Sequence, residues 1–494
     1  MNPASSDFCC AGVSRRTFLS DLGMGFAGLA LASLLQQDGV GRAADSGTLW
    51  LPPDGQPHFP PQAKSVIWLM MRGGVSHLES FDRKPALDQN SGKTIGQSAF
   101  PQILESRHLR NVREQVLNNI IDKQKAILYP AQVGFRHSGQ LGLEVSDWWP
   151  HLRAQVDDLA FVRSMWTTDN NHGAQLQLLT GRHLLDGCFP TIGSWIHYGL
   201  GALSEDLPQF IMMGAPLESQ CSEGLDADYL GPEHAGVMLN VDPNEPLPYA
   251  RPEQPVSAAE QQAKARLLGK LNQLTALEYP ADDKLRARIK SYELAFRMQS
   301  AVPEVLRFEE EGEETRRIYG LDRDVTRPFG QQLLAARRLV ERGVRFVQIC
   351  HGGGAAGAWD AHSKLKENHS NLCAQVDLPT AGLLQDLKQR GLLDETVVVW
   401  TTEFGRTPCA QGADGRDHHN YGFTIWMAGA GLKRGVIHGA TDELGFHAVE
   451  HRHYVTDIHA TLFHLLGLDP RRLEVPGRKR LEIDYGEVIR EILA

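Results

Sequence analysis

The sequence predicts an α/β fold with a mostly parallel central sheet and helices on both of its faces. Apolar runs of strand length recur along the chain, segments with helical spacing separate them, and polar or glycine-rich residues follow their ends. Strands that alternate with helices favour a parallel sheet, because each parallel crossover needs a connecting helix. The 494 residues, 42% hydrophobic and 22% charged, are sufficient for a large core.

Five runs rich in apolar and β-branched residues are predicted to be buried strands. They cover residues 65–71, 159–164, 345–350, 396–402 and 423–427. Apolar residues at helical spacing follow in three segments, 173–179, 370–390 and 454–468. Residues 257–317 are rich in Ala, Leu, Glu, Lys and Arg, with breaks only at Pro280 and Pro303. We predict that this segment is a helical insertion on the sheet domain.

The first 44 residues have the pattern of a twin-arginine signal peptide. Arg15 and Arg16 precede an apolar run over 22–35, and small residues follow it. The run is shorter than the roughly 20 apolar residues that span a bilayer. We therefore expect passage through the twin-arginine export machinery, a periplasmic or secreted domain of residues 45–494, and no stable membrane span. An uncleaved signal anchor is the alternative.

Net charge, cysteine spacing and missing motifs argue against several classes of function. The net charge of −10 argues against nucleic acid as a partner, since the phosphate backbone needs a basic face. The cysteines after the signal peptide show no CxxC spacing, which argues against a zinc ribbon or a thioredoxin-like site. In an oxidising compartment Cys188 and Cys221 are a candidate disulfide pair. Motifs of serine α/β-hydrolases, nucleoside triphosphatases and zincin proteases are absent at useful positions.

Acidic and imidazole side chains follow the predicted strands where these strands end. Asp360 and His362 follow the third strand and a run of glycines, and Glu403 directly follows the fourth. Ligands of open α/β sheets bind beyond the carboxyl ends of the strands, and carboxylate plus imidazole groups suit a divalent ion. We predict a metal site for Zn, Ca, Mg or Mn. Its predicted ligands are Asp360, His362, Glu403 and His418. The alternative for Asp360 is a helix cap.

Neighbouring residues are predicted to bind substrate or to orient ligands. The planar guanidinium of Arg406 matches sulfate, phosphate or carboxylate oxygens, although a salt bridge to Glu403 is the alternative. Asn171 and His172 open a helix after the second strand, where free amides favour anions; Asn171 is equally suited to be a helix cap.

Histidines are unusually frequent close to the predicted strand ends. Residues 411–421, which include Gly412, Asp414 and Gly415, are predicted to be a loop that carries Asp417, His418 and His419. Two adjacent histidines cannot easily face one ion, so we favour His418 as the ligand. Asp417 and His419 are then candidates for orienting it. Four more histidines lie within 447–459. Clusters of this kind favour metal binding or acid–base chemistry.

Several motifs resemble those of one family. They are Met71-Arg-Gly-Gly-Val-Ser-His77, Leu179-Thr-Gly181, Glu403-Phe-Gly-Arg-Thr-Pro408 and Gly415-Arg-Asp-His418. The chain resembles, over nearly all of its mature length, twin-arginine-exported bacterial proteins of the domain-of-unknown-function family DUF1501, which are often labelled sulfatases. That family in turn looks like a branch of the alkaline phosphatase superfamily, which includes sulfatases, phosphodiesterases and cofactor-independent phosphoglycerate mutases. The resemblance implies an alkaline-phosphatase-like fold.

The resemblance also implies roles for single residues. Asp360 and His362 resemble the first-metal Asp and His of the superfamily, and Glu403 stands where an Asp ends the corresponding strand. His418 falls about where the mutases place a later metal histidine. Two positions depart from the superfamily pattern. Glycines follow the first strand where a metal-binding Asp is usual, which leaves Ser76, His77 or Glu79 as substitutes. Asn171 takes the place of the sulfatase nucleophile.

These residues together predict an exported, metal-dependent hydrolase of sulfate or phosphate esters. Metal-bound water is the expected nucleophile, and Arg406 and His172 are expected to stabilise an anionic small-molecule or glycan substrate. The alternative is a catalytically inactive exported binding protein of the same fold, which holds an anionic glycan or a partner in the same cleft.

Overall fold

The central sheet confirms the predicted α/β class. The computed structural model describes residues 52–106, 126–217, 225–242, 246–247, 257–279, 283–478 and 480–494. The strands of its central sheet are β1 (Ser65–Met71), β4 (Leu159–Trp166), β5 (Phe210–Gly214), β6 (Val237–Met238), β7 (Phe346–His351), β8 (Thr396–Thr401), β11 (Phe423–Gly429), β12 (Val436–His438) and β15 (His453–Tyr454). Their order is β12-β4-β11-β8-β1-β7-β5-β6, and β15 also pairs with β4. Only β11 among these strands runs antiparallel to its neighbours, β4 and β8.

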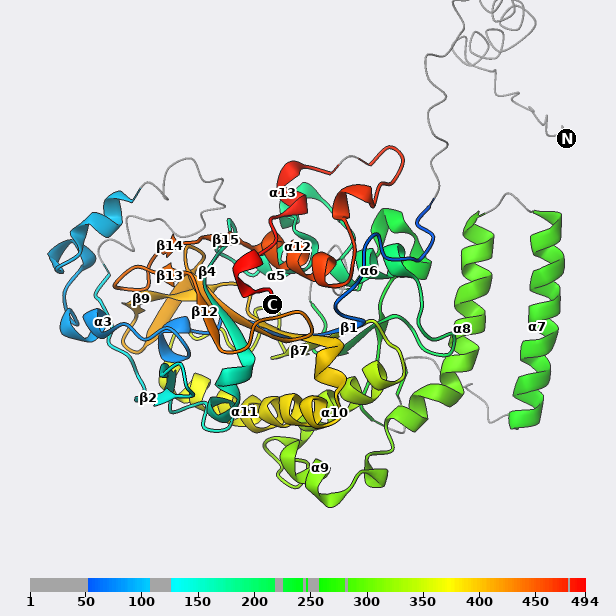
Figure 1. The fold of residues 1–494 in the computed structure, drawn as a ribbon, viewed down its shortest axis with the longest axis horizontal. Helices are drawn as coiled ribbons and strands as arrows, with labels where there is room; N and C mark the ends of the chain where they lie inside the picture. The colour runs from blue at the N-terminus through cyan, green and yellow to red at the C-terminus, as the bar shows by residue number, and fades with distance from the viewer. Residues whose placement is uncertain are drawn as a thin grey trace, which may run out of the picture. The chain divides into compact units, whose positions relative to one another are not determined.

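Helices cover both faces of this sheet, as predicted (Figure 1). One face carries α10 (Arg327–Glu341) and α11 (Leu365–Gln389), and the other carries α5 (Ala174–Thr180), α6 (Ile192–Leu200) and α12 (Val455–Leu465). Successive side chains of a strand point to opposite faces. Strand β1 therefore contributes Leu69 to the core under α10 and α11, and Trp68 to the core under α5, α6 and α12. Both are fully buried, as expected for a central parallel strand.

The segment 257–317 contains α7 (Ala258–Glu278), α8 (Asp283–Val305) and α9 (Glu313–Ile318). The predicted break at Pro303 falls inside α8, two residues before its end; Pro280 lies outside the described residues. Val302 and Val305 of α8 are buried in the same core as α10. Other helices and strands are α3 (Pro85–Gln89), α13 (Glu482–Tyr485), β2 (Phe135–Ser138), β3 (Leu143–Ser146), β13 (Ala440–Thr441) and β14 (Ala448–Glu450).

A polar hairpin corrects one part of the sequence analysis. Residues 411–421 were expected to be a loop, but β9 (Gly405–Gln411) and β10 (Gly415–His419) pair as an antiparallel hairpin. The glycines and Asp414 mark only its turn. The β10 strand lacks the apolar alternation by which strands are recognised, because its buried side chains are held by polar contacts instead. Arg416, for example, is fully buried in an ion pair with Glu79 (2.6 Å).

The predicted signal peptide, residues 1–44, lies outside the described residues. Within those residues, no helix is both long enough and apolar enough to cross a bilayer. Cys188 is disulfide-bonded. Its partner is not among the described residues, so the pairing with Cys221 stays a prediction. Cys350, Cys373 and Cys409 are buried thiols.

A buried histidine of α12 should make the protein sensitive to mild acid. His459 is 4% exposed, and its ring donates to the carbonyl of Leu178 (2.7 Å). Burial lowers the pKa of His459 to about 4, against 6.5 in the unfolded chain. As the pH falls from about 6.5 towards 4, the unfolded chain binds a proton at His459 that the native state does not bind. The free energy of unfolding therefore decreases. We expect His459 to account for about 2 kcal/mol of lost unfolding free energy between pH 7 and pH 5.

Urea unfolding at both pH values tests this expectation. The His459→Gln variant keeps a side-chain donor but does not titrate, so it should lose about 2 kcal/mol less than the parent protein between pH 7 and pH 5. Equal losses in the two proteins would show that His459 does not carry the effect.

Candidate metal centre

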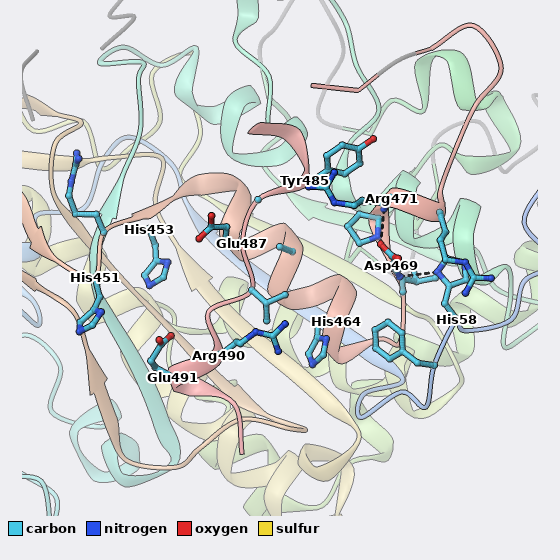
Figure 2. Close-up of a pocket in the computed structure, with 18 residues that line it drawn as sticks. His58, His451, His453, His464, Asp469, Arg471, Tyr485, Glu487, Arg490 and Glu491 are labelled. Atoms are coloured by element: carbon cyan, nitrogen blue, oxygen red, sulfur yellow. Dashed lines mark hydrogen bonds between the residues drawn. The ribbon is translucent and has the colours of Figure 1, made fainter. Parts of the chain in front are cut away.

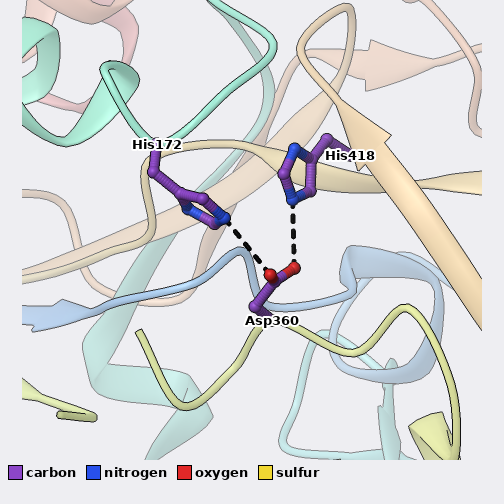
Figure 3. Close-up of side chains that lie close together, drawn as sticks. All are labelled: His172, Asp360 and His418. Atoms are coloured by element: carbon purple, nitrogen blue, oxygen red, sulfur yellow. Dashed lines mark hydrogen bonds and ion pairs between the residues drawn. The ribbon is translucent and has the colours of Figure 1, made fainter. Parts of the chain in front are cut away.

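Four side chains meet beyond the carboxyl ends of β4, β7 and β8. We call His172, Asp360, His362 and His418 the histidine–aspartate cluster. His172 follows β4, Asp360 and His362 follow β7, and His418 comes from β10. The Nε2 atoms of His362 and His418 each lie 3.0 Å from Asp360 Oδ1, and His172 Nε2 lies 3.3 Å from Asp360 Oδ2. Figure 3 shows the Asp360 carboxylate facing both His172 and His418.

The outer nitrogen of each ring faces an oxygen atom. His418 donates from Nδ1 to the carbonyl of Asn170 (2.9 Å), and His172 Nδ1 lies 3.3 Å from Glu403 Oε1. His362 Nδ1 faces the amide oxygen of Gln411. Carbonyl and ionised carboxylate oxygens only accept hydrogen bonds, so each Nδ1 carries the proton. A neutral ring then directs the lone pair of its Nε2 into the cluster.

These lone pairs fit a divalent metal ion. The Nε2 atoms of His362 and His418 are 3.0 Å apart, and both face the same carboxylate oxygen. Nitrogens this close to an anionic oxygen either carry protons, which the raised pKa values of His172 and His362 allow when no ion is bound, or share a cation that takes the place of those protons. Ligands of a tetrahedral zinc at about 2.0 Å lie about 3.3 Å from one another. The spacing of Asp360, His362 and His418 is therefore close to that of ligands of a shared ion, and His172 lies within reach of one ion together with Asp360 and His418.

Glu403 lies behind His172 and contacts the outer nitrogen of its ring. Its Oε1 accepts from the backbone N–H of Gly73 (2.8 Å) and from the side chain of Gln175 (3.0 Å). A carboxylate that holds the far nitrogen of a ligating histidine fixes the orientation of the ring and raises its basicity. Burial raises the pKa of Glu403, but the hydrogen bond with His172, the charge of His172 and the hydrogen bond from Gln175 together outweigh it, and the net shift is downward.

The structure explains why Gly73 and Gly74 follow β1. Gly73 has φ +118°, and a Cβ there would lie 2.5 Å from the backbone nitrogen of Asp360. The carbonyls of Gly73 and Gly74 both accept from Arg406. The position after β1, where a substitute for a metal-binding Asp was expected, is thus backbone that packs against the Asp360 loop.

Electrostatics keep Asp360 ionised. Burial raises the pKa of Asp360, but hydrogen bonds with the three imidazoles and the charge of Arg406 hold it well below its usual range. Burial also opposes a charge on His172, yet the carboxylates of Asp360 and Glu403 raise the pKa of His172 to about 9. The hydrogen bond with Asp360 raises the pKa of His362, whereas burial lowers that of His418.

Arg406 is fully buried, and its donors point at the protein interior. Its Nε donates to the carbonyl of Gly74 (2.8 Å) and its Nη1 to that of Arg416 (3.1 Å). Its Nη2 donates to the carbonyls of Trp359 (3.2 Å) and Gly73 and to Asp360 Oδ1 (2.7 Å). The side chain that was predicted to clamp a substrate therefore lies behind Asp360 and holds it.

Four other candidates lie next to the cluster or turn away from it. Asn171 accepts the backbone N–H of His172 (2.8 Å) on its side-chain oxygen. Asp417 Oδ1 lies 3.8 Å from His362 Nδ1, and with His362 and His418 it forms a second group within reach of one ion. Ser76 donates to Glu79, and His77 donates to the carbonyl of Gly445 (2.9 Å).

His419 also points away from the cluster. Its Nε2 faces the carbonyl of Phe446, on the other side of β10 from His418. Glu79 is occupied by its ion pair with Arg416.

Two glutamines that hold the cluster, Gln175 and Gln411, were not among the predicted site residues. Gln175 lies three residues after His172, in the first turn of α5, and this closeness along the chain could have indicated that the two side chains act together. Its side chain donates to Glu403 and accepts from Arg72 (3.1 Å). Gln411 meets His362 only because β9 and β10 pair, and no sequence pattern indicated that pairing.

Solved structures similar to this chain include a protein in the alkaline phosphatase superfamily from Vibrio parahaemolyticus, at 11% identity, with 92% of this chain and 79% of that chain covered and a TM-score of 0.33. A phosphonate monoester hydrolase from Silicibacter pomeroyi is 14% identical, with coverages of 67% and 73% and a TM-score of 0.32. The C-terminal periplasmic domain of EcEptC from Escherichia coli, in complex with Zn, is 10% identical, with coverages of 88% and 93% and a TM-score of 0.36.

No curated protein matches the chain. The family model for DUF1501, described as a protein of unknown function, matches residues 63–493. With nearly the whole described chain matched, the protein belongs to the DUF1501 family.

Proposed function

We propose that this protein is a metal-dependent hydrolase of sulfate or phosphate esters. The observation that carries the proposal is the convergence of three imidazole Nε2 atoms on the Asp360 carboxylate, each ring being fixed through its Nδ1. A divalent cation at such a site polarises an ester oxygen and makes water nucleophilic near neutral pH. His172, Asp360, His362 and His418 would hold the ion.

The ligand set favours zinc or a similar transition metal. Imidazole suits Zn, Cu, Fe and Ni, whereas Ca and Mg prefer oxygen ligands. Three nitrogens and one carboxylate therefore argue for zinc over calcium or magnesium. Asp417 Oδ1 lies 3.8 Å from the outer nitrogen of His362, so Asp417 is a neighbour of the donor set and not one of its four members.

The surrounding residues have supporting roles in this proposal. Arg406 and Glu403 act as positioning residues, because the first holds Asp360 and the second holds His172. The side chain of His362 is 36% exposed, against 7% for His418, so substrate approaches from the His362 side. The substrate would be an anionic small-molecule or glycan ester. The signal sequence supports a periplasmic or secreted location, reached by twin-arginine export.

Metal analysis followed by an activity screen tests the proposal. Purified protein should contain stoichiometric divalent metal. After chelation and reloading with Zn, Mn or Ca, it should hydrolyse at least one of three substrates: an aryl sulfate, a phosphomonoester or a phosphodiester. Protein with neither bound metal nor turnover would overturn the proposal.

A catalytically silent binding protein is the second candidate. It is favoured by Asn171, whose amide stands at the position of the sulfatase nucleophile and is bonded to the backbone of His172. Bound metal without turnover of any of the three ester classes would support this candidate.

The Glu403→Gln substitution should weaken metal binding about 10- to 100-fold. The neutral amide can still contact His172 Nδ1, but it no longer raises the basicity of the ring. Competition with a chromogenic zinc chelator measures the affinity. The matched control is Glu395→Gln at the other end of β8, where an exposed carboxylate pairs with Lys64. Equal affinities in the two variants would contradict the role of Glu403.

A further inference from the structure

A second group of ligand-type side chains lies at the edge of the central sheet. We call His438, His453 and Glu491 the edge cluster. His438 ends β12 and His453 begins β15, and both strands pair with β4 along the same edge. Glu491 lies in a short 3-10 helix, Arg490–Ile492, near the end of the chain. His453 belongs to the histidine-rich stretch 447–459, for which metal binding or acid–base chemistry was expected without any ligand being named.

The donor atoms of the edge cluster are spaced like the ligands of one ion. His438 Nε2 lies 2.9 Å from His453 Nε2 and 3.8 Å from Glu491 Oε2. All three donor atoms lie within 4.8 Å of one another. Ligands of a tetrahedral ion bound at about 2.0 Å are separated by about 3.3 Å, so these separations bracket the required value.

A buried carboxylate fixes the orientation of one histidine. His453 donates from Nδ1 to Asp457 Oδ2 (2.9 Å), and the other oxygen of Asp457 accepts the backbone N–H of Glu487 (2.9 Å). With the proton on Nδ1, the lone pair of His453 Nε2 points at His438. A carboxylate behind a histidine in this way is the usual support of a metal-binding imidazole.

An ordinary hydrogen bond explains only part of this arrangement. A proton on His438 Nε2 could be donated to His453. This hydrogen bond does not explain why the Glu491 carboxylate lies near the same nitrogen. A divalent ion accounts for all three groups together. It would also join β12, β15 and the C-terminal residues at an edge that is otherwise held by short strand pairings.

The edge cluster opens onto a cavity. His453 and Glu491 line a pocket of about 810 Å³, and Figure 2 shows them at one end of it with His451 beside them. The His438 side chain is 8% exposed and that of Glu491 is 56% exposed. An ion held here would have three protein ligands and an open side towards the cavity, so it could be loaded from solvent.

We propose that the edge cluster binds a second divalent transition-metal ion, separately from the histidine–aspartate cluster. The contacts of His438, His453 and Glu491 given above include no residue of that cluster. Two imidazoles and one carboxylate favour zinc or cobalt over calcium or magnesium.

Zinc titration of the full chain by calorimetry, together with the visible absorption of the cobalt(II) form, tests this site. Wild-type protein should bind two equivalents. His453→Gln should lose one equivalent and keep the other, and Glu491→Gln, which changes an exposed side chain, should weaken the same equivalent at least tenfold. His464→Gln is the matched control, because His464 lines the same cavity outside the edge cluster.

The experiment tests the edge cluster and the histidine–aspartate cluster separately. Loss of one equivalent in His453→Gln but none in His418→Gln would leave the edge site standing and remove the histidine–aspartate site. If wild-type protein and a folded His453→Gln variant bind the same number of zinc ions with unchanged cobalt absorption, the edge cluster is a hydrogen-bonded histidine pair and the proposal is wrong.

Discussion

Replacing His418 with glutamine is expected to remove the metal from the histidine–aspartate cluster and to lower ester hydrolysis by more than about 100-fold. Loss of a residue that only supports a ligand already costs about 10- to 100-fold in affinity or activity. His418 Nε2 lies 3.0 Å from both Asp360 Oδ1 and His362 Nε2, so its removal leaves a gap at the centre of the donor set. Elemental analysis and a steady-state assay measure the two losses.

The neighbouring residue provides the control for this experiment. Successive residues of β10 point to opposite sides, and the ring of His419 packs 4.5 Å from that of Phe446, between centroids. His419→Gln should therefore keep its metal and its activity, even if it unfolds somewhat more easily. Equal loss of metal in the two variants would mean that the hairpin matters only for folding.

Arg406→Met is expected to lower the free energy of unfolding by about 3–5 kcal/mol, the usual cost of removing one partner of a buried ion pair. The substitution leaves Asp360 and four backbone carbonyls without their donor. Zinc affinity should fall as well, because Asp360 loses the group that holds it. Urea unfolding and chelator competition measure the two effects, and Arg406→Lys should restore part of each.

A substrate clamp would give a different result. If Arg406 bound the ester directly, its loss would raise KM while stability and zinc affinity stayed the same. The control is Arg434→Met, since the side chain of Arg434 is 56% exposed and its ion pair with Asp394 is a surface contact. Exposed pairs contribute about 0–1 kcal/mol, so this variant should unfold almost like the parent.

Buried parallel strands were the most predictable part of the fold. The run 65–71 coincides with β1, and β4, β7, β8 and β11 overlap their predicted ranges. These strands are buried on both faces, so an uninterrupted apolar run is enough to reveal them. The hairpin of β9 and β10 was missed for the opposite reason, because its strands are buried through charges and backbone carbonyls rather than through apolar side chains.

The sequence predicted which region of the sheet holds the site, but not which side chains contact one another there. The rule that ligands gather beyond the carboxyl ends of strands anticipated the approach of His172, Asp360 and His418. Whether a carboxylate faces an ion or supports a histidine depends on the path of the backbone. Glu403 is two residues beyond β8 and reaches only the outer side of His172. Asp360 is nine residues beyond β7, and its longer loop brings it to the centre.

The edge cluster shows a different limit of sequence patterns. The stretch 447–459 was noticeable for its histidines, yet two of the three residues of the cluster, His438 and Glu491, lie outside it. His438 and His453 meet because β12 and β15 pair with the same strand, and only the folded sheet shows this.

The spacing of the cluster residues along the chain couples metal uptake to folding. His172 and Asp360 are separated by 188 residues, and His418 lies 58 residues further on. No short segment of unfolded chain holds the full donor set, so an ion that fits the cluster binds the native state almost exclusively. At a free concentration 1,000 times its dissociation constant, such an ion stabilises the native state by about 4 kcal/mol. Thermal melting with and without chelator would then report occupancy before any substrate is known.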